Sequence, residues 1–224
     1  MKILKNNKGY SLIEIIAGLP LVALVFVIFG IGIIHFTTTF QEVKLYTQLQ
    51  QDLFEAIEIM RHGYMLDGVT DDEGLIGLTT AKKVDLSSTV ELKVTPLVLN
   101  QELERLYWVK YYVDDNKQLK VRGSYGGSKN FTNEPIFPST PTKLIDGDPQ
   151  FTIKNIHDIW SVTPNTTDEM GNHYMINIRL VGQVRFREKS RHQTTEDDIR
   201  KNTRTITYET SVFLGNAHAN MAEE

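Results

Sequence analysis

Hydrophobic residues dominate the first forty positions of the chain. From Ile15 to Phe40 the sequence contains no Asp, Glu, Lys or Arg. A helix that crosses a hydrocarbon core of about 30 Å needs roughly 20 apolar residues, so this run is long enough to span a membrane. A core helix of a soluble protein is the alternative, but such helices are usually shorter and less uniformly apolar. Pro20 lies inside the run and predicts a kink or a weak turn, because proline has no amide hydrogen.

Beyond this run the pattern becomes that of an amphipathic helix. Apolar residues recur every three or four positions from Tyr46 to Tyr64. The polar residues between them are expected to face water: Gln48, Gln50, Gln51, Asp52, Glu55 and Glu58. Gly63 predicts the end of the segment. We therefore expect one helix of about 50 residues that includes both the apolar run and the amphipathic segment.

The rest of the chain, from about residue 67 to 216, shows the pattern of strands and turns. The alternation from Val84 to Val94 predicts a strand that ends before Pro96. LYWVKYYV and QLKVRGSY flank the polar residues 114–117 and predict a hairpin. Three more strands are expected in FTIKNI, HYMINIRLVGQVRF and TRTITYETSVFL. The sequence therefore predicts an α+β fold, in which a long N-terminal helix packs on an antiparallel β-sheet head.

The charges around the apolar run predict its orientation. Lys2, Lys5 and Lys8 all precede the run, and Glu42 closely follows it. By the positive-inside rule, the N-terminus is cytoplasmic and the residues beyond about 40 lie outside the cell membrane. A cleaved secretory signal is a poorer interpretation, because the run is too long and TTTFQEVKLY offers no small-residue cleavage site.

Glu14 is an unusual residue, because it lies at the start of the apolar run. A carboxylate within a bilayer costs about 2.5–3.5 kcal/mol at the centre and less near an edge. Such a residue is expected to have a function if a partner for its charge can be named. A snorkelling charge at a helix end would be the simpler interpretation of an isolated glutamate.

The residues Lys8-Gly9-Tyr10-Ser11-Leu12-Ile13-Glu14 resemble the processing motif of type IV pilins and of the pseudopilins of type II secretion. The resemblance implies that a prepilin peptidase cuts after Gly9 and that the new N-terminal Tyr10 is methylated on its amine. It also implies that Glu14 faces the N-terminal amine of an adjacent subunit in a filament. Pro20 departs from the family pattern, because the proline of family members often lies further along the helix.

The resemblance implies four parts of the chain. These are a leader at 1–9, a transmembrane and assembly helix at 10–40, an amphipathic helix at 41–64 that continues the stalk, and a β-rich head with a flexible C-terminal tail at 65–224. Loss of the leader removes three lysines and lowers the formal charge from −4 to −7. The run QLQQDLFEAIEIMRHGY and the closing TYETSVFLGN are similar to W-type minor pilins and J-type minor pseudopilins.

The composition argues against several kinds of chemistry. The chain has no cysteine, so disulfides and thiolate metal sites are excluded. The histidines lack ligand spacing, and no G-x-S-x-G elbow occurs, so we expect neither an enzyme nor a cofactor or metal. Asp71-Asp72-Glu73 and Asp146-Gly147-Asp148 could offer oxygen atoms to calcium, but neither matches an EF-hand loop.

The most basic stretch is a weak candidate for contact with nucleic acid. Arg185, Arg187 and Lys189 could contact phosphates. The arginines alternate with Val184 and Phe186, however, as in a strand with one solvated face. The acidic residues 196–198 would repel phosphate or pair with the basic stretch.

The sequence thus favours a minor pilin or pseudopilin that helps to assemble or start a type IV pilus or related filament. Its expected partners are the prepilin peptidase, other pilin-like subunits, an inner-membrane assembly platform and the lipid bilayer. Two alternatives stay open: a membrane-anchored module that binds DNA, a surface or an exported substrate, and an uncleaved single-span membrane protein.

Overall fold

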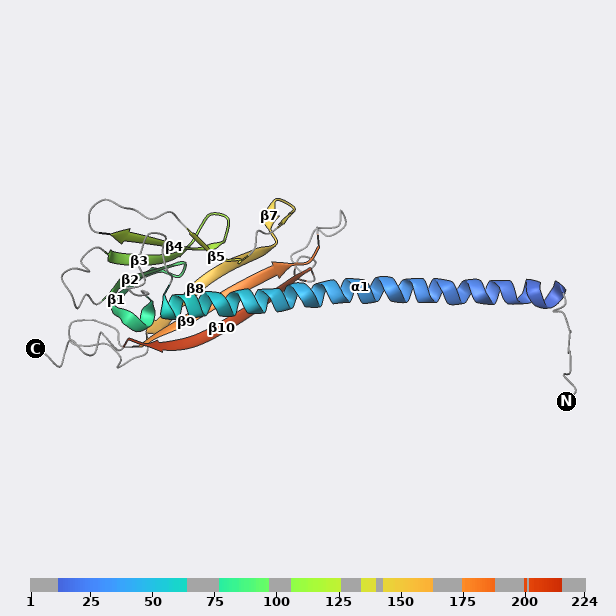
Figure 1. The fold of residues 1–224 in the computed structure, drawn as a ribbon, viewed down its shortest axis with the longest axis horizontal. Coiled ribbons are helices and arrows are strands. Elements are labelled where there is room, and N and C mark those ends of the chain that lie inside the picture. Colours follow the sequence, from blue (N-terminus) through green and yellow to red (C-terminus); the bar gives the residue numbers. More distant parts are fainter. Residues whose placement is uncertain are drawn as a thin grey trace, which may run out of the picture. The chain divides into compact units, whose positions relative to one another are not determined.

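The fold was established from a computed structural model. It describes residues 12–63, 77–96, 106–125, 134–139, 143–162, 175–187, 200 and 202–214. The chain divides into two compact units, Met1–Lys44 and Leu45–Glu224. The first unit contains the apolar part of the helix, and the second contains the rest of the helix and all the strands (Figure 1).

Helix α1 runs from Leu12 to His62, within the long helix that the sequence predicts over 10–64. It continues through Pro20, and its end is marked by Gly63, which has a φ of 107°. The Gly63 amide donates a hydrogen bond to the Ile59 carbonyl over 2.8 Å. This left-handed conformation costs glycine no steric strain, so Gly63 closes the last turn. The predicted long helix and its predicted terminator are both confirmed.

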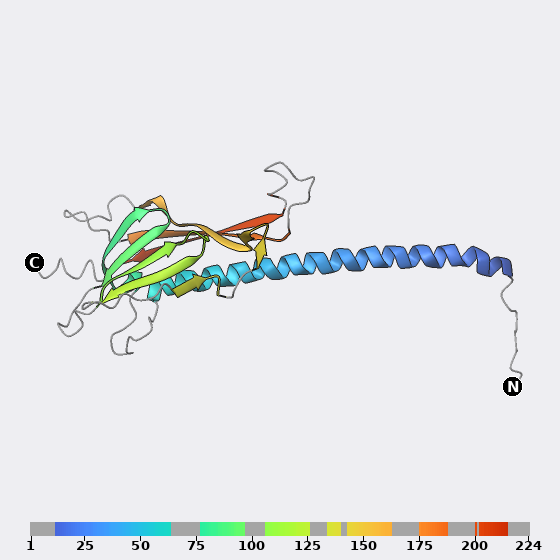
Figure 2. The ribbon, with the colours of Figure 1, turned by 90° about the horizontal axis from the view of Figure 1, so that it is seen from above.

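The first sheet is an antiparallel meander in the order β1-β2-β3-β4-β5 (Figure 2). Its strands are β1 (Ala81–Ser88), β2 (Glu91–Pro96), β3 (Leu106–Val113), β4 (Leu119–Tyr125) and β5 (Glu134–Phe137). The short 3₁₀ helix η2 (Leu78–Thr80) precedes β1. The predicted hairpin of β3 and β4 is confirmed: the Asp114 side chain accepts a hydrogen bond from the Gln118 amide over 2.8 Å and organises the turn.

The second sheet has the order β10-β9-β8 and is also antiparallel. Its strands are β8 (Phe151–Val162), β9 (Met175–Arg185) and β10 (Thr203–Phe213), which correspond to the three predicted late strands. A separate two-stranded hairpin joins β6 (Leu144–Ile145) to β7 (Asp148–Pro149). The fold class is therefore α+β.

Within the second unit, the C-terminal part of α1 packs on the sheets. Leu49, Leu53, Ala56, Ile57 and Met60 are buried and belong to one core with the inward residues of both sheets. Figure 1 shows this part of the helix lying along β8, β9 and β10. A Cβ atom on Gly182 of β9 would lie 2.7 Å from both Leu53 methyl carbons. The absence of a side chain at Gly182 therefore allows β9 to approach Leu53 of α1 this closely.

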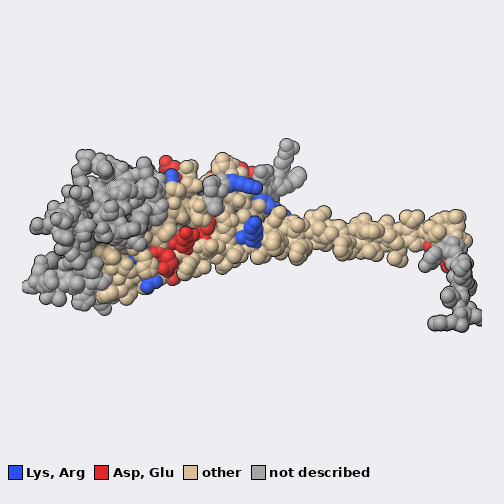
Figure 3. Space-filling model, viewed as in Figure 1, with Lys and Arg blue, Asp and Glu red and all other residues tan. Residues whose placement is uncertain are grey.

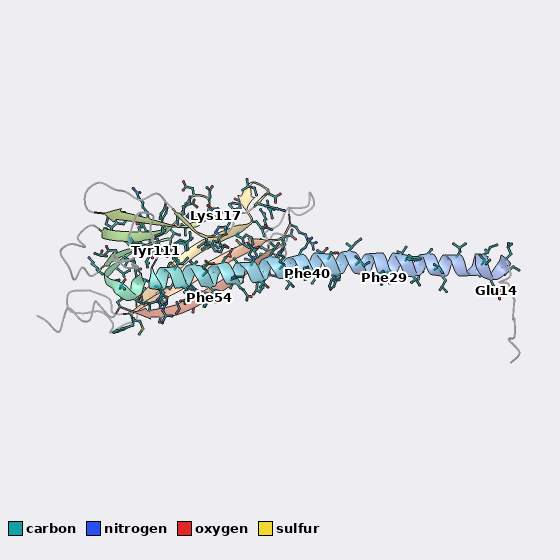
Figure 4. All side chains as sticks on the ribbon, in the orientation of Figure 1. Glu14, Phe29, Phe40, Phe54, Tyr111 and Lys117 are labelled. Carbon is teal, nitrogen blue, oxygen red and sulfur yellow. The ribbon has the colours of Figure 1, made fainter. Side chains whose placement is uncertain are left out.

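Two predictions about this unit are wrong. The alternating segment Val84 to Val94 is not one strand but the hairpin of β1 and β2, which turns at residues 89–90, and β2 includes Pro96. Asp52, which was expected to face water, is only 4% exposed. Ser139 explains its position, because its hydroxyl donates a hydrogen bond to Asp52 Oδ1 over 2.7 Å. In contrast, Phe54 in the same part of the helix is 56% exposed (Figure 4).

Candidate functional site

The first candidate site is the apolar part of α1. Its large apolar side chains are exposed, with fractions from 51% at Val22 to 78% at Ile13. Figure 3 shows this part of the helix as a continuous run of uncharged residues on the face in view. The helix is long and apolar enough to cross a membrane. So much exposed apolar surface needs lipid or protein around it.

Hydroxyl groups near the end of this run are satisfied within the helix. The Thr37 hydroxyl donates to the Ile33 carbonyl, that of Thr38 to the Ile34 carbonyl over 2.8 Å, and that of Thr39 to the His35 carbonyl over 3.0 Å. Such back-bonding removes the need for water at these hydroxyls. The three threonines are therefore compatible with an apolar environment.

Glu14 lies in the first turn of α1 and is exposed (Figure 4). Unpaired amides at a helix N-terminus carry partial positive charge, so a carboxylate is favourable in this turn. Gly9 and Tyr10, the predicted cleavage and methylation residues, lie outside the described residues. Helix α1 continues through Pro20. The kink expected at this residue stays a prediction.

The second candidate site is Arg185, the first residue of the basic stretch. Its side chain is only 13% exposed and lies near the two carboxylates of the β6–β7 hairpin. The guanidinium is 3.6 Å from Asp146 Oδ2 and 3.9 Å from Asp148 Oδ2, and it donates to the Ile145 carbonyl over 3.2 Å. The structure therefore brings together two motifs that the sequence suggested for separate roles, in calcium binding and in phosphate contact.

The rest of the basic stretch is less defined. Arg187 is exposed, while Lys189 and the acidic residues 196–198 lie outside the described residues. A small polar cavity of about 140 Å³ lies beside Arg185 and is also lined by Lys117, Gln150 and Gln183. The two cations at this cavity, Arg185 and Lys117, face the two carboxylates Asp146 and Asp148, so these four side chains leave no net positive charge to attract a phosphate.

Sequence reasoning missed the β6–β7 hairpin, although a signal for it exists. Asp146 has a φ of 52° and Gly147 a φ of 85°. Asp-Gly is the preferred dipeptide for a two-residue hairpin turn with both residues at positive φ. In the sequence alone, the same residues also suggest a calcium loop. Within the described parts of the chain, no group of three His, Asp or Glu side chains could hold a metal ion.

The chain matches no model of a known protein family, no curated protein and no solved structure. The long apolar N-terminal helix and the antiparallel sheets are compatible with a pilin-like fold.

Proposed function

We propose that this chain is a minor pilin or pseudopilin, a structural subunit that helps to assemble or start a type IV pilus or a related filament. The observation that carries the proposal is the position of Glu14. It lies in the first turn of a helix whose next charged residue is Glu42, and it follows the Gly9-Tyr10 pair at the spacing of the prepilin motif.

The proposed assembly contact explains the presence of a carboxylate at the edge of an apolar helix. Cleavage after Gly9 would create a free amine on Tyr10. In a bundle of membrane helices, the amine of one subunit and Glu14 of the next attract each other strongly, because the surrounding dielectric constant is low. Each charge also offsets the desolvation cost of the other. Processing would thereby be linked to assembly.

The proposal includes a location and a set of partners. The chain would first lie in the cytoplasmic membrane as a single-span protein, with its N-terminus cytoplasmic and its head outside. The prepilin peptidase and an inner-membrane assembly platform would then act on it, and it would join other pilin-like subunits in a filament at the cell surface. The subunit itself would catalyse no reaction.

The direct test of processing is the intact mass and N-terminal sequence of the chain from membranes, with and without a prepilin peptidase. We expect a chain that begins at methylated Tyr10 only when the peptidase is present. A chain that begins at Met1 in both membranes would contradict the proposal and favour an ordinary single-span protein.

A second test addresses assembly. Glu14→Ala should leave membrane insertion intact, since it removes a charge from an apolar helix, but it should prevent incorporation into a filament. Glu42→Ala, the same substitution at the other end of the uncharged run, is the matched control. The measurement is the amount of each variant in sheared filaments relative to membranes; equal recovery of both variants would count against the assembly role of Glu14.

A further inference from the structure

The outer face of the first sheet carries a row of three cations. Strand alternation directs Val94, Val109 and Val121 into the core, so their neighbours Lys93, Lys110 and Arg122 lie on the opposite face. Lys93 is directly opposite Lys110, and Lys110 is directly opposite Arg122. The three side chains therefore form a row across β2, β3 and β4, the central strands of the sheet.

Such a row is unfavourable in the isolated sheet, because like charges on directly opposed residues repel each other. Glu91 forms an ion pair with Lys110. Asp85 lies opposite Lys93 in the register, but its ion pair is with Lys83 over 3.5 Å. Among the residues that the structure describes, no carboxylate forms an ion pair with Lys93 or Arg122. This face is cationic although the whole chain has a formal charge of −4.

Two aromatic rings flank the row. Trp108 and Tyr112 lie on β3 on either side of Lys110, on the same face and each half-buried. The Lys93 ammonium is 5.4 Å from the centre of the Trp108 ring, and the Lys110 ammonium is 5.9 Å from the centre of the Tyr112 ring. The central strand β3 therefore presents an aromatic residue, a cation and a second aromatic residue over about 13 Å, the length of four residue steps along a strand.

From this arrangement we infer that the outer face of the first sheet binds single-stranded nucleic acid. The row of Lys93, Lys110 and Arg122 receives the phosphates, and Trp108 and Tyr112 provide surfaces on which unpaired bases stack. Positive charge together with aromatic side chains is how sheet surfaces hold single strands without strong sequence preference. A duplex keeps its bases stacked inside, so it offers no unpaired bases to the two rings.

This binding site goes beyond the proposed function and does not depend on it. Neither cleavage after Gly9 nor assembly through Glu14 is needed for the face to form, because all five residues lie on three paired strands. The site is also distinct from the basic stretch that begins at Arg185, whose guanidinium contacts two carboxylates.

The first experiment measures the affinity of the full chain in detergent for fluorescently labelled oligothymidine of about 20 nucleotides, which is longer than a typical single-strand site of roughly 4–16 nucleotides. Replacing Lys93, Lys110 and Arg122 together by Gln should lower the affinity at least tenfold. The slope of log affinity against log salt should also become shallower by about 2, because each lost phosphate contact contributes about 0.7 on a single strand.

The matched control makes the same change in charge elsewhere on the chain. Lys143, Lys154 and Arg187 are exposed and lie off the first sheet, and their joint replacement by Gln should leave the affinity within about twofold, because the long-range field alone is screened by salt. An equal loss in the control variant would overturn the proposal. Equal affinity of the native chain for a duplex, for heparin or for vesicles of anionic phospholipid would overturn it as well.

The second experiment detects stacking on Trp108. The chain has two tryptophans, so Trp160→Phe leaves Trp108 as the only indole. Oligothymidine should quench its fluorescence, whereas heparin, a polyanion without bases, should not. Bound oligothymidine that leaves the fluorescence unchanged would overturn the proposal. Circular dichroism of each variant shows whether it is folded, so a loss of binding is not confused with unfolding.

Discussion

At the scale of single residues, Asp52 makes the least expected contact in the head. One carboxylate oxygen accepts a hydrogen bond from Ser139, and the other, Oδ2, is buried without a hydrogen-bond donor among the described residues. Burial of an unsatisfied polar atom costs free energy, and burial of a charge costs more. The buried position of Asp52 is therefore maintained mainly by the Ser139 hydroxyl and by the packing of the apolar residues next to Asp52 on α1.

We predict that Ser139→Ala lowers the free energy of unfolding by about 1–3 kcal/mol, because it leaves both oxygens of the buried Asp52 without a donor. Asp52→Asn should cost less, since it removes the buried charge. Urea unfolding checks both variants. The control is Ser211→Ala, whose exposed hydroxyl donates to Asn177 over 2.7 Å. A cost at Ser139 no larger than at Ser211 would show that Asp52 does not depend on this hydrogen bond.

At the scale of elements, the contact of α1 with β9 depends on the absence of a side chain at Gly182. We predict that Gly182→Ala destabilises the head by about 1–3 kcal/mol, the usual cost of inserting a methyl group into a well-packed core. The new Cβ would meet Leu53, so Leu53→Ala in the same chain should recover part of that cost. A double-mutant cycle by urea unfolding measures this coupling. Simple additivity of the two substitutions would contradict the contact.

The β6–β7 hairpin is the second element whose order depends on one side chain. Arg185→Gln removes two ion pairs and the hydrogen bond to the Ile145 carbonyl. We expect hydrogen exchange at the Gln150 amide, which donates to the Lys143 carbonyl across this hairpin, to become about tenfold faster as local opening becomes easier. Arg187→Gln, the same change at an exposed position, should leave that rate unchanged. Identical exchange in both variants would refute the stabilising role of Arg185.

At the scale of the whole molecule, the head should lose stability in alkali. Burial raises the pKa of Tyr111, and a hydrogen bond with Asp114, 2.7 Å away, raises the pKa of Lys120. Both groups hold their protons more tightly in the folded than in the unfolded chain. Their contribution is therefore complete below the ordinary pKa values, near 10, and is lost as the pH rises above them.

We expect the free energy of unfolding to fall above pH 10 with a slope of up to about 1.4 kcal/mol per pH unit for each proton. Tyr111→Phe removes the titrating phenol and should make this slope shallower. Urea unfolding of the full chain in detergent between neutral pH and the alkaline range gives the measurement. An unchanged slope in Tyr111→Phe would show that its burial does not control alkaline unfolding.

The sequence predicted those parts of the molecule that depend on local patterns. The helix Leu12–His62, its end at Gly63 and the β3–β4 hairpin each follow from neighbouring residues. The β1–β2 hairpin escaped prediction because its turn, at residues 89–90, lacks the glycine or asparagine that usually marks one. The alternation of apolar and polar residues continues through this turn, so the segment resembles a single strand.

The remaining misses concern contacts between distant parts of the sequence. Asp52 is buried because it meets Ser139, which lies 87 positions away, and Arg185 meets Asp146, which lies on another hairpin. The row of Lys93, Lys110 and Arg122 depends on the register of three strands. A shift of one residue in the pairing of β2 with β3, or of β3 with β4, would separate the three cations. No pattern within a single strand could therefore predict the row.

The threonine run at the end of the apolar helix has a mechanical consequence. A membrane anchor usually has a fixed depth, because polar groups at its ends hold on to interfacial water. Here the hydroxyls of Thr37, Thr38 and Thr39 are bound to carbonyls of their own helix and need no such water. In the proposed membrane setting, the depth of this end is therefore set by the first charged side chain, Glu42, less than one helical turn beyond Thr39, and not by the threonines.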